Sequence, residues 1–331
     1  MIERSQILAL PLFDGLEGEQ LAVALAAFKP FEVGPGELLM DEGEPDRSLM
    51  IVIEGELQVS LGGVDLGRVS QGETVGEMAL FGSFDRRTAS VRTTTGPTRL
   101  LVLDEDALRF LRIQDNPVGR ALEVAALNNT ARRLREMDFR IARMAAGLAD
   151  QRQPQRSLMS RLTSSLLGGG RPKGAAPDVM DVLAATSGFA NKDPEVLANI
   201  AARLRMVSAT AGENIIEEGQ QGDDAFIVAA GHIGVLCRTE QGTVERVATL
   251  GPGHIFGHVS LTDSRVRSAT CRALEAVYLV RIPGPVYRQF EIEQTSEGRV
   301  FRRGIIDALA AQLRLANEHY LQMVRTARSG S

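Results

Sequence analysis

Residues 36–59 read GELLMDEGEPDRSLMIVIEGELQV, and residues 212–235 repeat the pattern as GENIIEEGQQGDDAFIVAAGHIGV. The two segments align without gaps at an offset of 176 residues, with glycine at the same three places. Two further pairs of segments also match: QGETVGEMAL (71–80) with PGHIFGHVSL (252–261), and RTASV (87–91) with RSATC (267–271). The offset drifts to 181 and then 180, as expected when length changes fall in loops. This internal repeat predicts two copies of one fold.

Each copy contains short runs of strand-forming residues separated by Gly, Pro and Asp turn signals. The clearest runs are Leu49–Ile53, Leu57–Leu61, Leu100–Leu103, Ala225–Val228, Ile233–Cys237 and Ala276–Ile282. Gly55 and Gly231 each lie between two such runs, which is typical of a tight turn with positive φ. Many short strands at regular spacing indicate an antiparallel sandwich or barrel. The predicted fold class is mainly β with flanking α: two tandem β-jelly-roll domains, each followed by a helix.

Composition limits the classes of protein that fit. The chain has 331 residues, of which 44% are apolar and 24% charged, enough for two domains with their own cores. A net charge of −5 argues against a general nucleic-acid-binding surface. The sequence contains no run of 18 apolar residues and no secretory signal, so we expect a cytoplasmic protein without a membrane span. Cys237 and Cys271 are expected to be buried free thiols.

A heptad pattern follows the first copy. Its a and d positions are apolar except for Thr130, and the apolar seam consists of Leu127, Leu134, Met137, Ile141, Met144 and Leu148. Arg133 and Asp138 fall at g and the following e, a relation that permits an ion pair between parallel chains. The seam favours a homodimer, and packing of the same stripe on the helix's own domain remains the alternative.

The pattern divides the chain into five parts. Residues 151–177 are basic, contain no acidic residue and include three consecutive glycines, so they are interpreted as a flexible linker that a protein effector or anionic surface could order. After Phe290 the sequence has one long helical pattern instead of two short helices around a turn, so no DNA-binding domain is expected. The predicted parts are a first jelly roll (1–117), a long helix (118–150), the linker (151–177), a degenerate second jelly roll (178–292) and a C-terminal helix (293–331).

One short segment carries most of the chemistry. Gly76 permits close backbone approach, Glu77 supplies a carboxylate, and a helical turn begins at Met78. Arg87 follows ten residues after the carboxylate. N–H groups at the start of a helical turn and an arginine fork both bind phosphate oxygens. This combination indicates a ligand with one phosphate and a neighbouring hydroxyl.

The motif G-E-x-A-L…R-T-A-S-V and the upstream F-x-x-G-x-G-x-x-L-x-x-x-G framework resemble the cyclic-nucleotide-binding domain family, which includes catabolite-activator proteins and protein kinase A regulatory subunits. The resemblance covers about 12–113 and 187–290. It implies that Glu77 accepts a hydrogen bond from the ribose 2′-hydroxyl, that Arg87 holds the cyclic phosphate, and that Gly76 admits the sugar. It also implies that the N–H groups of Ala79 and Thr88 complete the phosphate cradle. The candidate ligand-binding residues are Gly76, Glu77, Met78, Ala79, Arg87, Thr88 and Ala89.

The second copy departs from this motif at the carboxylate, where His258 replaces glutamate while Arg267 is retained. A neutral imidazole can hydrogen-bond a hydroxyl but brings no negative charge, whereas a protonated one would favour an anion. The domain is therefore either an empty scaffold or a site for another phosphate-bearing ligand. The residues of this possible degenerate site are Gly257, His258, Ser260, Arg267 and Ser268.

The expected function is a receptor for a cyclic nucleotide with one intact site, acting as a non-enzymatic regulatory or adaptor protein on a separate effector. Cyclic AMP is favoured by its frequency in the family, and the residues do not distinguish it from cyclic GMP. The alternative is a pseudo-receptor that binds no nucleotide and serves as an assembly module. His254 and His258 are spaced i, i+4, but the chain has four histidines and no repeated ligand set, so neither a metal nor another cofactor is expected.

Overall fold

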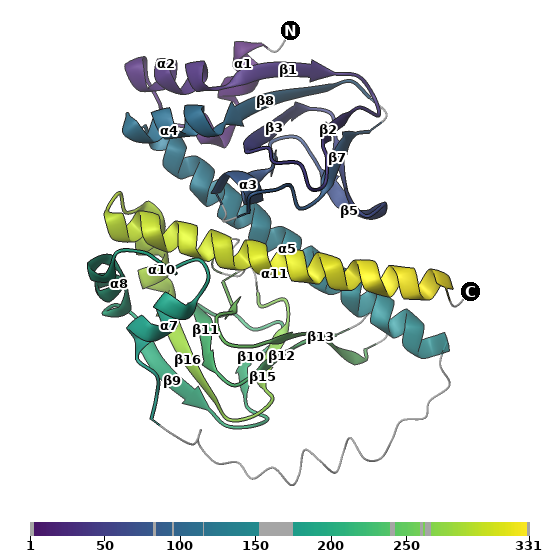
Figure 1. Ribbon diagram of the computed structural model, residues 1–331, viewed down its shortest axis with the longest axis vertical. Helices are drawn as coiled ribbons and strands as arrows, with labels where there is room; N and C mark the ends of the chain where they lie inside the picture. Colours follow the sequence, from purple (N-terminus) through teal and green to yellow (C-terminus); the bar gives the residue numbers. More distant parts are fainter. Residues whose placement is uncertain are drawn as a thin grey trace. The chain divides into compact units, whose positions relative to one another are not determined.

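The computed structural model describes residues 3–81, 84–94, 96–114, 116–151, 175–238, 242–258, 261 and 266–329, with the backbone alone for 146–151 (Figure 1). The chain forms two compact units, Met1–Asn129 and Thr130–Ser331. Each unit contains one of the two sequence repeats, together with part of the long helix that follows the first repeat.

The first unit is built on two four-stranded antiparallel sheets, in the orders β1-β8-β3-β6 and β2-β7-β4-β5. Their strands are β1 (Lys29–Val33), β2 (Leu38–Met40), β3 (Ser48–Glu54), β4 (Leu57–Leu61), β5 (Val64–Val69), β6 (Thr74–Val75), β7 (Ser90–Thr93) and β8 (Thr98–Asp104).

The core of this unit lies between the two sheets. The first six residues of β3 are all buried, because this central strand is covered on both faces. Val52 and Leu100 from one sheet and Leu57 and Val91 from the other meet in a single apolar cluster. Removing these side chains from water is the main favourable term that holds the sheets together.

The second unit repeats the same strand orders, β9-β16-β11-β14 and β10-β15-β12-β13. Its strands are β9 (Arg205–Ala209), β10 (Asn214–Ile216), β11 (Asp224–Ala230), β12 (Ile233–Arg238), β13 (Val244–Leu250), β14 (Ile255–Phe256), β15 (Thr270–Ala273) and β16 (Val277–Pro283). The predicted pair of jelly rolls with flanking helices is therefore confirmed.

Individual hydrogen bonds repeat as well as strands. Arg87 N–H donates to Glu44 O at 2.8 Å, and Arg267 N–H donates to Gln220 O at 2.9 Å. The expected turn glycine Gly55 has φ +93°, and its counterpart in the second unit has φ +82°. The gapless alignment of the two segments thus reflects a main chain that follows the same path in both units.

Helices flank both barrels. The two long ones, α5 and α11, each follow a barrel, and among the described residues no helix is long and apolar enough to cross a membrane. The helical elements are α1 (Arg4–Leu8), η1 (Pro11–Phe13), α2 (Gly18–Ala27), α3 (Glu77–Phe81), α4 (Glu105–Ile113), α5 (Pro117–Gln151), α7 (Val179–Ala185), α8 (Pro194–Ala201), α10 (Gly284–Ile292) and α11 (Ser296–Ser329).

The heptad seam lies on α5, which the two units share. Leu127, Met137 and Ile141 are buried by other parts of the same chain, Leu134 and Met144 are half-buried, and the side chain of Leu148 lies outside the described residues. A parallel coiled coil would have to exchange these intrachain contacts for contacts with a partner. The homodimer through this seam therefore stays a prediction, and so do the domain boundaries, because residues 152–174 of the linker lie outside the described part of the chain.

Candidate functional site

Gly76 connects β6 to α3 in the first unit. Its φ is +89°, a conformation that side-chain-bearing residues rarely adopt. A Cβ at this position would lie 2.4 Å from Ser48 O and 2.7 Å from Arg87 Nη1. Glycine is therefore required both by the turn and by the close approach of the arginine.

The turn places Glu77 at the start of α3, where its side chain is fully buried. Met78 and Ala79 follow it and are also buried. The N–H group of Ala79 donates to Gly76 O at 3.2 Å within the helical turn, so its predicted contact with a phosphate stays a prediction. Thr88 lies against Met78, with its Oγ1 3.6 Å from the sulfur, and Ala89 is half-buried beside it.

Arg87 returns to this turn and is only 4% exposed. Its Nη1 donates to Ser48 O at 2.8 Å, and its Nη2 donates to Ser48 Oγ at 2.8 Å and forms an ion pair with Asp46. The Asp46 side chain is 47% exposed, so one partner of the buried guanidinium borders solvent. The sequence predicted that Gly76, Glu77 and Arg87 come together, and the structure brings them together.

Sequence reasoning missed two of these arginine partners, Asp46 and Ser48. They lie about forty residues before Arg87, Asp46 in the irregular segment before β3 and Ser48 at the start of β3. A signal was present in the repeat, because Asp46 aligns with Gly222 and Ser48 with Asp224. The second copy therefore changes these partners of its arginine as well as the glutamate.

The helices that follow the first barrel contact both ends of the cassette formed by β6, α3 and Arg87. Asn129 of α5 donates through Nδ2 to Thr74 Oγ1 at 2.7 Å. At the other end, Arg112 of α4 lies over the Phe81 ring at 5.6 Å and donates to Glu123 of α5 at 3.1 Å. A displacement of the cassette would therefore act on α4 and α5 through specific contacts.

The second unit keeps the turn and the arginine. Gly257 has φ +81°, and buried Arg267 donates from Nη2 to Asp224 O at 2.6 Å and from Nη1 to Gly257 O. A Cβ on Gly222 would lie 2.4 Å from Arg267 Nε, so glycine makes room for the guanidinium at the place of Asp46. Nη1 and Nη2 of Arg267 thus both donate to main-chain oxygens.

His258 occupies the place of Glu77 and is 1% exposed. Burial, together with the positive charges of Arg267 and Arg135, lowers the pKa of His258 to about 3. The imidazole is therefore neutral at physiological pH, and the protonated form that would favour an anion is not the populated one. Ser268 lines a cavity beside Arg267, and Ser260 lies outside the described residues.

The two histidines at i, i+4 do not assemble with other metal ligands in the described part of the chain. His254 Nδ1 lies 3.0 Å from Gly251 O, and within the described residues no group of three or more His, Cys, Asp or Glu side chains could hold a metal ion.

The model of the family described as "Cyclic nucleotide-binding domain" matches residues 30–115 and 206–291, together just over half of the chain. The chain belongs to the cyclic nucleotide-binding domain family. The matched segments begin in or just after the first strand of each barrel and extend past the arginine of each cassette. Both repeats therefore carry the domain, including the repeat that lacks the glutamate.

The curated relatives are proteins of several kinds. The cGMP-dependent protein kinase egl-4 of Caenorhabditis elegans is 25% identical over 255 residues, which cover 77% of this chain and 25% of the kinase. The CRP-like cAMP-activated global transcriptional regulator of Mycobacterium tuberculosis is 23% identical over 148 residues, 44% of this chain and 64% of the regulator. The chain spans about a quarter to a third of the length of the first curated relatives it matches.

Among solved structures, the regulatory domain of Toxoplasma gondii PKA with cAMP is 18% identical, covers 87% of this chain and 93% of its own, and gives a TM-score of 0.32. A cyclic nucleotide-binding domain from Methylobacillus flagellatus is 19% identical, covers 44% of this chain and 82% of its own, and gives a TM-score of 0.40.

Proposed function

We propose that the chain is a cyclic-nucleotide receptor with one working site, in the first domain, and that it regulates a separate effector. The observation that carries the proposal is the buried guanidinium of Arg87, 4% exposed, held beside buried Glu77 at a turn that only glycine fits. Burying an arginine and a carboxylate costs several kcal/mol each unless partners compensate them. A bound phosphate and ribose hydroxyl are partners of the kind that a guanidinium and a carboxylate bind.

The ion pair with Asp46 suggests how the site changes on binding. Asp46 is a side chain at the edge of solvent, so it can yield its place on Arg87 Nη2 to a phosphate oxygen. A phosphate with two acceptor oxygens matches the fork geometry of arginine better than one carboxylate oxygen does. Ligand would then exchange one charged partner of Arg87 for another instead of filling an unpaired site.

A conformational change on ligand binding would be transmitted through α4 and α5, the helices that contact the cassette. Asn129 is bonded to Thr74 and Arg112 lies over Phe81, so a shift of β6 or α3 would change the contacts of α5 and α4. A ligand that binds one arrangement of these helices more tightly shifts the population toward it. Dimerisation through the α5 seam and an effector at residues 151–177 are the outputs that we propose for this shift.

Cyclic AMP is the ligand that we favour, and cyclic GMP is its direct competitor. The mycobacterial relative is a cAMP-activated regulator, whereas the nematode relative is a cGMP-dependent kinase. Both nucleotides carry the same ribose and phosphate, so the cassette treats them alike. The rival function is an assembly module that binds neither, and one observation favours it: Arg87 already has Asp46 and Ser48 as partners.

Isothermal titration calorimetry of the full chain with cyclic AMP and cyclic GMP separates these functions. We expect saturable binding of at least one nucleotide by the wild type, and Arg87→Ala should weaken it about 100-fold, or about 2.7 kcal/mol, because a buried charge-assisted contact with phosphate is lost. Arg86→Ala is the matched control, since Arg86 is the exposed neighbour and contacts Gly43 O. Absence of binding by a folded wild type would support the assembly module.

A further inference from the structure

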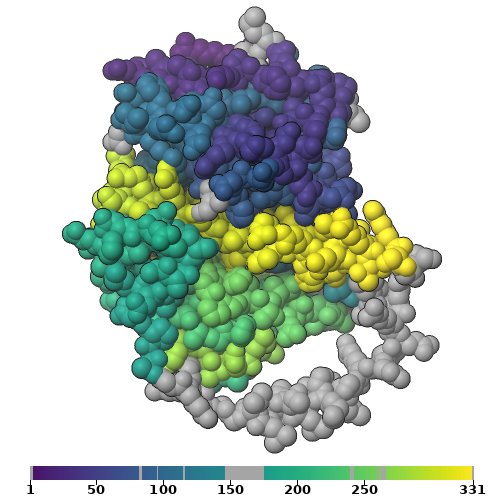
Figure 2. Space-filling view, viewed as in Figure 1, coloured from purple at the N-terminus to yellow at the C-terminus, as the bar shows by residue number. Residues whose placement is uncertain are grey.

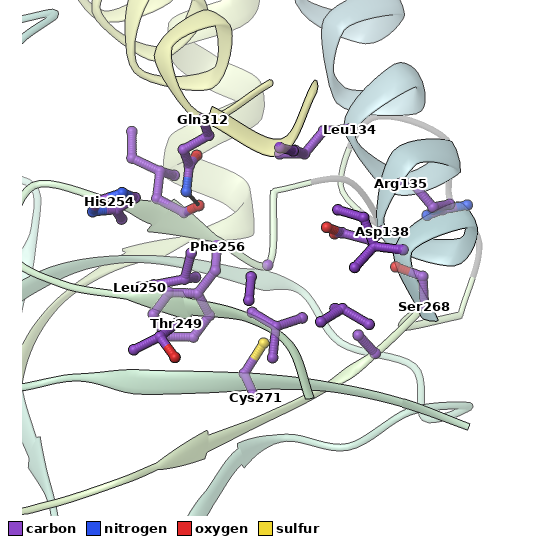
Figure 3. Close-up of a pocket in the computed structure, with 18 of the residues that line it drawn as sticks. Leu134, Arg135, Asp138, Thr249, Leu250, His254, Phe256, Ser268, Cys271 and Gln312 are labelled. Atoms are coloured by element: carbon purple, nitrogen blue, oxygen red, sulfur yellow. Dashed lines mark hydrogen bonds between the residues drawn. The ribbon is translucent and has the colours of Figure 1, made fainter. Parts of the chain in front are cut away.

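The second domain contains a cavity of about 450 Å³, which is lined in part by Gly257, His258, Arg267 and Ser268 of the possible degenerate site (Figure 3). Its floor is the sheet that contains β12, β13 and β15, and its walls come from α5 and α11. Cavities of this size are typical of sites for small organic molecules. The whole cavity lies in the unit Thr130–Ser331.

Asp138 of α5 points toward this cavity, whereas Arg135, nearly one turn earlier, points away from it (Figure 3). Among the described residues, the Asp138 carboxylate has no hydrogen bond and no ion pair. Burial raises its pKa to about 7, so the protonated and the ionised carboxyl are both populated at neutral pH, and a ligand that donates to this group would favour the ionised form. The heptad pattern predicted that this residue could form an ion pair with a partner chain. In the structure its side chain lines the cavity.

Gln312 of α11 brings a second acceptor to the same space. Its Nε2 donates to Ile255 O at 2.9 Å, which fixes the orientation of the amide (Figure 3). The other amide atom, Oε1, is buried and has no hydrogen-bond partner within the described residues. The side chain is 7% exposed, so bulk water does not satisfy this oxygen.

His258 adds a third polar group. It is 1% exposed, and neither ring nitrogen has a hydrogen-bond partner in the described part of the chain. Because it is neutral, it offers one donor and one acceptor. Buried polar groups without partners are rare in proteins, and the presence of two of them, on His258 and Gln312, beside one cavity indicates a missing molecule.

The hydrogen-bond donors and acceptors around the cavity restrict the kind of ligand that it can bind. Gln312 Oε1 needs a donor, and so does the ionised form of Asp138, whereas an ionised phosphate has none. Arg267, the remaining candidate for a phosphate, donates to the main-chain oxygens of Asp224 and Gly257. Main-chain oxygens cannot swing away as Asp46 can in the first domain. The walls around the polar groups are apolar and include Phe256, Ile141 and Val235.

We infer that this cavity binds an uncharged aromatic heterocycle rich in N–H or O–H donors, of the nucleobase or nucleoside type and without phosphate, with Asp138 and Gln312 as its acceptors. The site is independent of the cyclic-nucleotide site of the first domain, so either can fail without the other. Because Asp138 lies on α5, which begins in the first unit, occupancy of this site would stabilise the packing of that helix on the second barrel.

Calorimetric titration of the full chain with adenine, guanine, adenosine and guanosine tests the inference. We expect one of the four probes to bind with one site per chain, and Asp138→Asn to weaken it at least tenfold, because an amide replaces one of the two acceptor oxygens with a donor. Glu136→Gln changes an exposed carboxylate on the same helix and should leave affinity unchanged. Arg87→Ala should also have no effect.

A second variant distinguishes a loss of binding from a loss of folding in Asp138→Asn. Ala316→Phe would fill the cavity from α11 and should abolish binding of the same probe while leaving cyclic-nucleotide binding intact. The inference is overturned if all four probes fail to bind a folded wild type, if binding survives both Asp138→Asn and Ala316→Phe, or if it is lost in Arg87→Ala.

Discussion

At the scale of single residues, the first cassette is a set of buried charges arranged by one glycine turn. Arg87 touches Gly76, Ser48 and Asp46, and Glu77 is buried beside it at the start of α3. Each residue type suits a different part of a cyclic nucleotide: the guanidinium suits the phosphate, and the carboxylate suits a hydroxyl.

The role of Glu77 can be tested by removing either partner of the proposed contact. Wild type should bind 2′-deoxy cyclic AMP about 10 to 100 times more weakly than cyclic AMP, because the ribose hydroxyl no longer satisfies a buried carboxylate. Glu77→Gln should bind both ligands weakly and should discriminate much less between them. Competition against a fluorescent cyclic nucleotide gives both affinities, and discrimination that persists in Glu77→Gln would assign the hydroxyl contact elsewhere.

Residue patterns predicted the central members of this site but not their supporting contacts. Gly76, Glu77 and Arg87 lie within twelve residues, and their spacing alone indicates an anion site. Asp46 looks like an ordinary turn residue until the strands pair and bring it to Arg87. His258 was visible as a substitution, whereas its protonation state depends on burial that no sequence pattern states.

At the scale of elements, strands were more predictable than the packing of α5. Short runs of strand-forming residues bounded by turn signals predict β3, β4 and β8, because both signals are local in the sequence. A heptad seam predicts that one face of α5 packs against another element, but it does not identify that element. The structure covers part of that face within the chain and directs Asp138 into the second domain's cavity.

The environment of Asp138 makes a prediction about stability and pH. Its carboxyl has an ordinary pKa of 3.8 and a pKa of about 7 in the folded protein. Below pH 4 the group is protonated in both states and makes no contribution. As pH rises from 4 to 7 the unfolded state loses this proton first, so the free energy of unfolding falls.

Asp138→Asn removes that titration. The variant should equal wild type near pH 4 and exceed it at pH 8 in free energy of unfolding, on the order of 2 kcal/mol. Chemical denaturation of both proteins across this pH range measures the difference, and Glu136→Gln should not show it. A constant difference between wild type and Asp138→Asn at every pH would contradict a buried, titrating carboxylate. Other titratable groups that line the cavity are common to both proteins and cancel: Arg135, Arg246, His254, His258, Arg267, Cys271 and His319.

At the scale of the whole chain, one fold appears twice with different residues around its arginine. The strand orders of the two barrels are the same, and the main-chain bonds around Arg87 and Arg267 repeat, so the scaffold has been kept. The residues aligned with Asp46, Ser48 and Glu77 of the proposed site differ in the second copy, where they are Gly222, Asp224 and His258. The repeat predicted the shared scaffold, whereas the cavity shared by α5, α11 and the second barrel required the structure.

The central claim is that only the first domain binds a cyclic nucleotide. Its most direct test is the number of cyclic AMP molecules bound per chain at saturation, measured by equilibrium dialysis with wild type, Arg87→Ala and Arg267→Ala. We predict one molecule per chain for the wild type, the same number for Arg267→Ala, and none for Arg87→Ala over the same concentration range. Two molecules per chain, or a single molecule lost in Arg267→Ala and kept in Arg87→Ala, would contradict the account.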